Sequence, residues 1–266
     1  MKKILLLFLL ILCGTVVYAN DIDVKYSDGI YSIKLSGKLM KKKIKFVSSD
    51  KLVTNKEIHK KYKSQLTINT GFFDPKNEKT ISYIFSDGKM IEDPTTNENL
   101  LLNPVLAENM DKILNRSEFR ITECNRKLKY SIVPHNTPVD YSCKIIESAQ
   151  GGPQILPELR LEEEFFILKN DEGNIIRQSA SVLDRTARTI IGLKNDDVYI
   201  LIITNKNPKN IFEVRNLCKS MGLESAMAFD GGSSTSLNYK KRINVTSTQF
   251  GLADTGRKLK SFMIIK

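Results

Sequence analysis

The sequence feature that most constrains the fold is a strand–turn–strand pattern over residues 189–203. Two almost entirely apolar runs, 189–193 and 198–203, are separated by four polar residues. This pattern predicts a β-hairpin, and the very apolar second arm indicates a strand at the centre of a sheet. We therefore expect a strand-rich core.

The other patterns predict more strands than helices. Apolar–polar alternation and short apolar runs indicate strands at 29–36, 43–47, 66–69, 119–122, 127–133, 225–229 and 260–265, with a second hairpin over 81–91. Helical patterns cover 54–63, with Asn55 as the N-cap, and 210–221, which Gly222 ends. The acidic run 162–164 is interpreted as a solvated face. We expect an α+β fold, a single mixed domain with a strand-rich core and a few covering helices.

The N-terminus has the pattern of a secretory signal peptide. Two lysines precede the apolar run 4–12, and Ala19 is a small residue at the cleavage position. The apolar run is short for a membrane span. We predict a signal peptide over 1–19 and an exported chain, periplasmic or secreted, whose folded domain is 20–266, with 20–60 as an N-terminal strand extension. A retained N-terminal membrane anchor is the alternative.

The chain is strongly basic, with 41 lysines and arginines against 30 acidic residues. Clusters at 41–45 and 60–63 carry much of this charge and favour association with an anionic envelope surface, through polymers or lipid head groups. A plain solvated, lysine-rich surface is the simpler alternative. No nucleic-acid-binding motif accompanies the charge, so we expect no nucleic-acid partner.

Cysteine and histidine usage argues against several kinds of catalysis. An exported chain can form disulfides, and Cys124 and Cys143, which flank a strand-like segment, are the predicted pair. Cys218 lies in the predicted helix 210–221 and is interpreted as a core residue. His59 and His135, the two histidines, lie in unrelated polar surroundings. A His-rich metal site or a Ser-His-Asp triad is therefore not expected.

Polar chemistry is concentrated in four runs at predicted strand ends: 69–75, 150–153, 184–189 and 230–235. The most informative is the last, in which an apolar strand delivers Asp230 into two glycines and a series of hydroxyl residues. Together the runs provide carboxylates, arginines, an amide and hydroxyls. Arginine suits phosphate, and carboxylates suit acid–base or nucleophilic work at a sugar carbon. The predicted ligand is a sugar phosphate or an anionic glycan.

The order of these runs resembles that of the phosphodiester glycosidase family, the domain found in the enzyme that uncovers mannose 6-phosphate by removing N-acetylglucosamine. The residues that carry the resemblance are Asn69, 71–73, 151–153, 188–192 and 230–235. The resemblance implies hydrolysis of a phosphodiester that joins the anomeric carbon of a sugar to another group. Ser233 stands where a third glycine is common, so we expect a variant substrate.

From the resemblance and the chemistry we assign roles to the candidate residues. Arg188, helped by Arg185, is assigned to the phosphate, and Asp230 to the role of nucleophile, base or ligand of sugar hydroxyls. The N–H groups of two glycines and the amide of an asparagine are expected to orient the substrate. The catalytic candidates are Asp230, Arg188 and Asp74, and the substrate-binding candidates are Asn69, Gly151, Gly152, Arg185, Thr189, Gly231, Gly232, Ser233 and Ser234. Mg²⁺ or Ca²⁺ is compatible with these oxygen-rich groups, although no ligand spacing demands a metal.

Simpler structural interpretations stay open for some of these residues. Asp74 with Pro75 can be a turn, Arg185 a surface residue, and Phe72 and Phe73 a core or pocket wall. Two other functions also stay open. One is a non-catalytic glycan- or envelope-binding protein with the same fold, and the other is a phosphodiesterase that attacks phosphorus.

Overall fold

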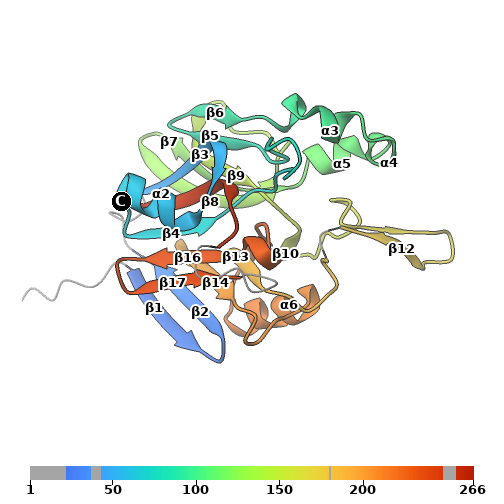
Figure 1. Cartoon of the computed structure of the whole chain (residues 1–266). Helices are drawn as coiled ribbons and strands as arrows, with labels where there is room; N and C mark the ends of the chain where they lie inside the picture. The colour runs from blue at the N-terminus through green and yellow to red at the C-terminus, as the bar shows by residue number, and fades with distance from the viewer. Residues whose placement is uncertain (1–21, 37–42, 180, 248–255) are drawn as a thin grey trace, which may run out of the picture.

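The computed structural model describes residues 22–36, 43–179, 181–247 and 256–266. The predicted signal peptide, residues 1–19, lies outside the described residues. Figure 1 shows a mostly β architecture in which short helices lie at the edges. The expected α+β class is confirmed in broad form, but helices contribute less than a mixed domain implies. Within the described ranges, no helix is long and apolar enough to cross a membrane.

The predicted hairpin 189–203 lies inside a six-stranded antiparallel sheet. Its two arms, β13 (Arg188–Lys194) and β14 (Asp197–Ile203), pair along their whole length. Both faces are buried, because Ile191 and Ile200 belong to one hydrophobic cluster and Ile190 and Leu201 to another. The strand order is β1 (Ile22–Ser27), β2 (Ile30–Leu35), β14 (Asp197–Ile203), β13 (Arg188–Lys194), β15 (Ser225–Ala228) and β10 (Gln154–Leu156).

Two five-stranded antiparallel sheets share a hydrophobic core with the first. In one of them the C-terminal strand of the chain lies between two early strands. Its order is β17 (Ile243–Thr246), β16 (Ser236–Tyr239), β4 (Leu66–Asn69), β18 (Leu259–Ile265) and β3 (Ile44–Val53). The other has the order β6 (Lys89–Glu92), β5 (Ile84–Ser86), β9 (Cys143–Gln150), β7 (Ser117–Cys124) and β8 (Lys127–Pro134). A separate ribbon pairs β11 (Ile167–Lys169) with β12 (Ile175–Gln178). Residues 22–53 thus supply strands to two of the sheets.

The two predicted helices are present with one correction. Helix α6 (Ile211–Ser220) begins after its N-cap Asn210 and buries Val214 and Cys218 against the six-stranded sheet. Helix α2 (Asn55–Tyr62) is capped by Thr54, whose side chain exchanges hydrogen bonds with Glu57 in a capping box. The expected cap Asn55 is wrong, because its buried amide instead donates to Thr67 O and Ser236 Oγ.

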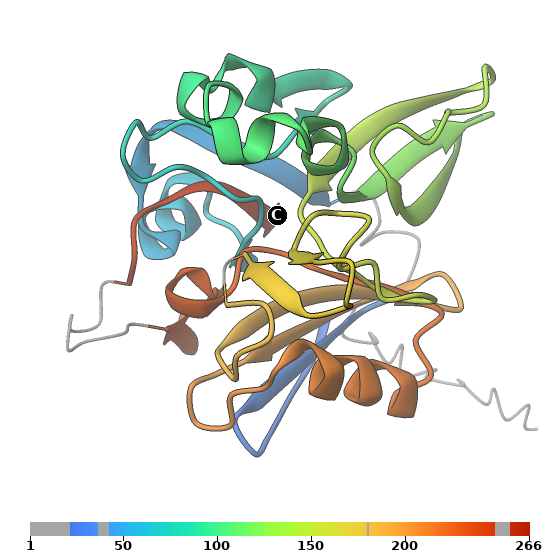
Figure 2. The same cartoon turned by 90° about the vertical axis from the view of Figure 1, so that its right-hand side faces the viewer.

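Residues 94–114 form a chain of short helices that carries one wall of the pocket described below. Asparagine and proline set the starts of the turns, as in α4, where Pro104 follows the N-cap Asn103. The helices pack on Phe165 through Leu100 and Ile113. In Figure 2 they lie above the yellow β11–β12 ribbon. The elements are η1 (Pro94–Thr96), α3 (Glu98–Leu101), α4 (Pro104–Ala107) and α5 (Met110–Leu114).

The predicted disulfide between Cys124 and Cys143 is present, joining register partners of β7 and β9. Replacing both cysteines with serine is expected to lower the free energy of unfolding by about 3 kcal/mol, because the bond closes a loop across a sequence separation of 19. Urea denaturation of the variant and of the unmodified protein with and without reductant measures this. Reductant should lower the urea midpoint of the unmodified protein alone. An equal decrease for the variant would contradict the assignment of the stability to the disulfide.

Candidate active site

A pocket of about 270 Å³ lies between the helices of residues 94–114, the β11–β12 ribbon and the end of β15. Among the described residues, its lining combines one carboxylate with three guanidinium groups, three phenylalanine rings and an aliphatic wall. The residues are Asp230, Arg116, Arg177, Arg257, Ser179, Phe72, Phe73, Phe166, Ile81, Leu100, Leu106 and Ile113. The aliphatic wall comes mainly from α3, α4 and α5, so the segment without any recognised motif helps to build the site.

Asp230 lies two residues after the last residue of β15, Ala228, and is held there by its backbone. Its N–H donates to Thr70 O at 2.9 Å, and its carbonyl accepts from Asn69 Nδ2 at 2.6 Å. Burial raises the pKa of the carboxyl group from 3.8 to about 6, although a hydrogen bond from Ser234, the charge of Arg257 and the N–H of Gly231 favour the ionised form. The site therefore contains a carboxylate that titrates close to neutral pH.

Arg257 lies beside this carboxylate at the start of β18. Its Nη1 donates to Ser233 Oγ and Ser234 Oγ, both at 3.1 Å. The guanidinium also lies 4.9 Å from the centre of the Phe73 ring. Ser233 and Ser234 thus belong to the site as supports of the arginine, and Ser234 connects it to Asp230.

Arg116 is the most deeply buried cation of the pocket. Its guanidinium packs 4.2 Å from the Phe166 ring centre and 5.6 Å from that of Phe72, while Nε donates to Glu164 O at 3.0 Å. Burial lowers the pKa of Arg116 to about 10. The charge of Glu164 opposes this decrease, and the charge of Arg177 adds to it. Among the described residues its terminal nitrogens have no hydrogen-bond partner. A buried guanidinium with free donors facing a pocket suits an anion.

Arg177 completes the positive side of the pocket from the β11–β12 ribbon. Its Nη1 donates to Phe165 O at 3.2 Å, and its guanidinium lies 4.2 Å from the Phe165 ring centre. The pocket lining therefore presents more positive than negative charge to a ligand.

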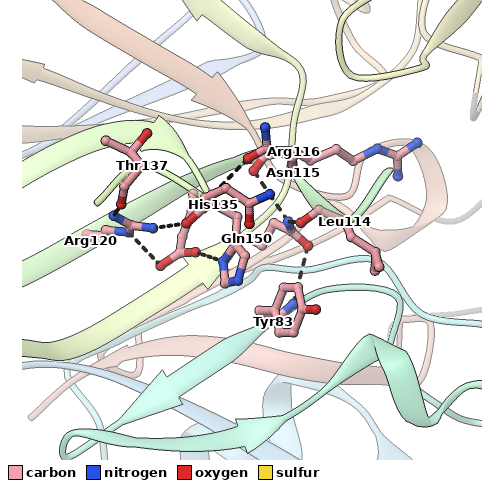
Figure 3. A network of polar contacts seen from close by, with 10 residues as sticks. Tyr83, Leu114, Asn115, Arg116, Arg120, His135, Thr137 and Gln150 are labelled. Atoms are coloured by element: carbon pink, nitrogen blue, oxygen red, sulfur yellow. Dashed lines mark hydrogen bonds and ion pairs between the residues drawn. The ribbon is translucent and has the colours of Figure 1, made fainter. Parts of the chain in front are cut away.

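A polar network behind Arg116 fixes the backbone that carries it (Figure 3). Gln150 Nε2 donates to Leu114 O at 2.7 Å and to Arg116 O at 3.3 Å, and the N–H of His135 donates to the same Arg116 carbonyl. His135 in turn contacts Glu118 through Nδ1 and stacks on Tyr83 with ring centres 3.9 Å apart. This network positions the arginine and is itself separated from the pocket lining.

Asn69 and Thr189 are brought to the site but are not open to a ligand. Asn69 Oδ1 accepts from Thr189 Oγ1 at 2.7 Å and from Ser236 N at 3.0 Å, and its Nδ2 is bonded to Asp230 O. Both side chains are fully buried. In the structure Asn69 and Thr189 hold the Asp230 turn and do not line the pocket.

The two arginines assigned to phosphate also lie outside the pocket lining. Arg188 is buried, and its Nε and Nη2 donate to four carbonyl oxygens at 2.7–3.2 Å, those of Ser181, Val182, Asp184 and Lys209. Burial lowers its pKa to about 10. Arg185 is exposed and paired with Glu213 at 2.5 Å. Arg188 therefore braces the segment 181–184 and the backbone of Lys209, and Arg185 is a surface residue.

Asp74 and the glycine pair 151–152 also lie outside the pocket lining. Asp74 accepts from Lys76 N and Asn99 Nδ2 and lines a separate hollow, as expected for a turn. The N–H groups of Gly151 and Gly152 already donate to Ser117 O and Ala228 O. Glycine is needed there for packing, because a Cβ on Gly152 would lie 2.4 Å from Glu164 Oε2.

The position of Glu164 differs from the prediction, because the acidic run 162–164 was expected to be solvated. Its side chain is fully buried and accepts from Ser117 Oγ at 2.6 Å and Gln154 N at 3.1 Å. Burial raises its pKa. The carboxyl group thus anchors the strand start next to Arg116.

The remaining glycines shape the turn after Asp230. Gly232 adopts a left-handed φ of +57° and donates to Ala187 O at 2.8 Å. A Cβ on Gly231 would lie 3.1 Å from the same carbonyl. Ser233 follows in the 3-10 turn η2 (Gly232–Ser234) without a positive φ, so the backbone here does not require a third glycine.

Sequence patterns missed Arg116, Arg177 and Arg257. Arg116 precedes the mixed polar and apolar strand β7, so it lacks the signal of an arginine that opens an apolar run, which Arg188 has. Only the structure distinguishes the arginine that lines the pocket from the one that braces a loop. No group of three His, Cys, Asp or Glu residues within the described ranges could hold a metal ion, so Mg²⁺ and Ca²⁺ remain unassigned.

Comparison with known proteins agrees with this arrangement of motifs. The family model of the phosphodiester glycosidases matches residues 62–266. The chain therefore belongs to the phosphodiester glycosidase family. A search of curated proteins found no match.

Solved structures share the fold at low sequence identity. The catalytic domain of zebrafish N-acetylglucosamine-1-phosphodiester alpha-N-acetylglucosaminidase, auto-inhibited by its pro-peptide, is 15% identical with a TM-score of 0.66, over 92% of this chain and 81% of that chain. A hypothetical protein from Synechocystis is 12% identical, with a TM-score of 0.59, over 91% of this chain and 61% of that one. A putative exported protein from Burkholderia pseudomallei is 9% identical, with a TM-score of 0.59, over 89% and 73%.

Proposed function

We propose that the chain hydrolyses a phosphodiester that links the anomeric carbon of a sugar to a second group. The observation that carries this proposal is the pocket itself, in which one carboxylate with a pKa of about 6 faces three guanidinium groups and three aromatic rings. Membership of the phosphodiester glycosidase family supports it. A cavity of about 270 Å³ suits a single sugar phosphate rather than a longer ligand.

The arginines would hold the phosphate as it leaves. Arg116 and Arg257 flank the pocket, and Arg177 adds a third positive charge. The terminal nitrogens of Arg116 have no hydrogen-bond partner among the described residues, whereas Nη1 of Arg257 is held by two serines. Stabilising the charge on a leaving phosphate lowers the barrier to breaking the bond from the anomeric carbon to oxygen. Phosphate leaves readily, so this reaction needs no second carboxyl group to protonate it, in contrast to ordinary glycoside hydrolysis.

Asp230 would act as the general base. A base works best when its pKa lies near the pH at which it operates, and a pKa of about 6 meets that condition. In this mechanism the ionised carboxylate takes a proton from a water molecule that attacks the anomeric carbon, while its charge stabilises the oxocarbenium-like transition state. The rings of Phe72, Phe73 and Phe166 would contact the sugar faces.

Hydrolysis in ¹⁸O-labelled water tests the bond that is broken. Attack at the anomeric carbon places the label in the released sugar, as we expect. Label in the released phosphate would show attack at phosphorus and would overturn the glycosidase mechanism in favour of a phosphodiesterase.

Arg257→Gln is expected to lower kcat/KM for a sugar-1-phosphodiester at least about 100-fold, because a charge-assisted contact to the leaving phosphate is lost. For an aryl glycoside of the same sugar, whose leaving group lacks the phosphate charge, the change should stay below about threefold. Arg185→Gln is the matched control, since this arginine lies outside the pocket lining. Equal losses on both substrates would contradict a role at phosphate.

We also propose that the chain is exported and acts on envelope or exopolysaccharide material. The support is the signal-peptide pattern of residues 1–19 and the disulfide between Cys124 and Cys143. Fractionation of cells that express the full chain, with mass spectrometry of the mature N-terminus, tests export. Detection of an intact residue 1 in an anchored protein would favour the membrane anchor instead.

A further inference from the structure

A second concave surface, of about 690 Å³, lies between α2 and the turn that joins β16 to β17. We call it the basic groove, after the six cationic residues that line it: Lys56, Lys60, Lys63, Lys240, Lys241 and Arg242. Figure 1 shows α2 and the β16–β17 turn on one side of the molecule and α3–α5 on the other. The groove therefore lies apart from the candidate active site.

The charge of the basic groove is uncompensated. No acidic residue lines it, and none of its six cations forms an ion pair within the part of the chain that the structure describes. By contrast, Arg257 in the active-site pocket faces Asp230. Like charges gathered on one concave surface repel one another, and walls of low dielectric concentrate their field. Such a surface attracts a ligand with several negative charges.

The two walls of the basic groove are fixed to each other. His59 on α2 contacts Lys240 O through Nε2 at 3.0 Å and Ser64 Oγ through Nδ1 at 3.1 Å. Lys240 N donates to Gln65 O at 2.7 Å, and Asn238 Nδ2 donates to Asn55 Oδ1 at 2.8 Å. The backbone that carries the cations is therefore ordered before a ligand arrives, which reduces the entropic cost of binding.

We propose that the basic groove binds the phosphate groups of an anionic glycan chain, at a site distinct from the active-site pocket. A concave surface with polar side chains between its cations suits discrete phosphates of a soluble chain better than the plane of a bilayer. The two sites lie at opposite ends of β16, since Ser236 contacts Asn69 at one end and Lys240 follows the other. Four residues of strand separate these ends by about 13 Å. A polymer held in the groove would stay close to the enzyme between cleavage events.

Binding of a synthetic poly(glycerol phosphate) to the full mature chain tests the proposal. The Asp230→Asn background prevents cleavage, so the measurement does not depend on the proposed activity. The groove variant is Lys240→Gln, Lys241→Gln and Arg242→Gln, and a second variant changes Lys56, Lys60 and Lys63 on the opposite wall to glutamine. The matched control removes the same charge from three exposed lysines elsewhere, Lys127, Lys129 and Lys219, also by glutamine.

Each groove variant is expected to raise Kd at least about tenfold at low salt, and the Kd of the unmodified groove should rise steeply with added salt. The control should change Kd less than about twofold. Equal losses in groove and control variants would reduce the effect to net charge and overturn the proposal, as would an absence of polymer binding. Vesicles of phosphatidylglycerol form a further arm, and groove-dependent binding to vesicles alone would assign the surface to lipid head groups instead.

Discussion

Replacing Asp230 with asparagine is expected to lower kcat for a sugar-1-phosphodiester about 1,000-fold, the range found for loss of a general base. The asparagine keeps the shape of the side chain, so KM should change little. The unmodified enzyme should lose activity as the pH falls through about 6, because the carboxylate must be ionised to accept a proton. Steady-state kinetics between pH 4.5 and 8 measures both effects, and the residual activity of the variant should lack that acidic limb.

The same substitution is expected to stabilise the protein. The folded-state pKa of Asp230, about 6, is raised above its ordinary value of 3.8, so folding favours the protonated form. The stability that this carboxyl group contributes is complete below about pH 4 and is lost as the pH rises through about 6. At pH 7.5 the variant should therefore gain on the order of 3 kcal/mol in the free energy of unfolding, and at pH 4 almost nothing. Urea denaturation at the two pH values measures this.

Asp74→Asn is the matched control for Asp230→Asn. Asp74 was the second carboxylate candidate by sequence, and it lines a different hollow. We expect its kcat to stay within about twofold of the unmodified enzyme, because the side chain does not reach the pocket. A loss comparable to that of Asp230→Asn would show that the two carboxylates work together and that the single-carboxylate mechanism is wrong.

Arg188→Met is expected to lower the free energy of unfolding by about 3 kcal/mol or more. The buried guanidinium donates to four carbonyl oxygens, and methionine leaves these acceptors without a donor. In the folded fraction, KM for the phosphodiester should change less than about threefold, since Arg188 does not line the pocket. Arg188→Lys, which keeps one charge but loses the planar fork, should give an intermediate loss of stability.

Arg185→Met serves as the control for Arg188→Met. Its exposed ion pair with Glu213 should contribute less than about 1 kcal/mol. If Arg188→Met left the stability unchanged and raised KM strongly, the arginine would contact the phosphate after all. Urea denaturation and steady-state kinetics on the same preparations distinguish these results.

The sheet core was largely predictable because apolar periodicity dominates it. The hairpin 189–203 and the strands around it bury alternate residues on two faces, and this leaves a direct record in the sequence. The burial of Glu164 was not predicted, because it leaves no pattern in the local sequence. Its burial depends on Ser117, 47 residues earlier, and on Gln154, 10 residues earlier, and an acidic run contains no sign of such partners.

The candidate site was predicted in part. Asp230 and the turn after it could be found, because a strand end with glycines leaves a local pattern. Arg116, Arg177 and Arg257 come from separate parts of the chain and meet only through the packing of helices, ribbon and sheet. Arg188 was assigned to phosphate from the family resemblance and the chemistry of its planar fork, and in the structure its partners are backbone carbonyls.

The hydrogen bonds of Asn69 lead to a prediction of how activity should be lost on heating. Its side chain joins β4 of one sheet to β13 of another and also holds the carbonyl of Asp230. A small separation of these sheets would displace the carboxylate while both sheets remain formed. Thermal inactivation should thus occur at a lower temperature than the loss of β-sheet circular dichroism. Activity would then report whether the sheet of β4 and the sheet of β13 are still in contact.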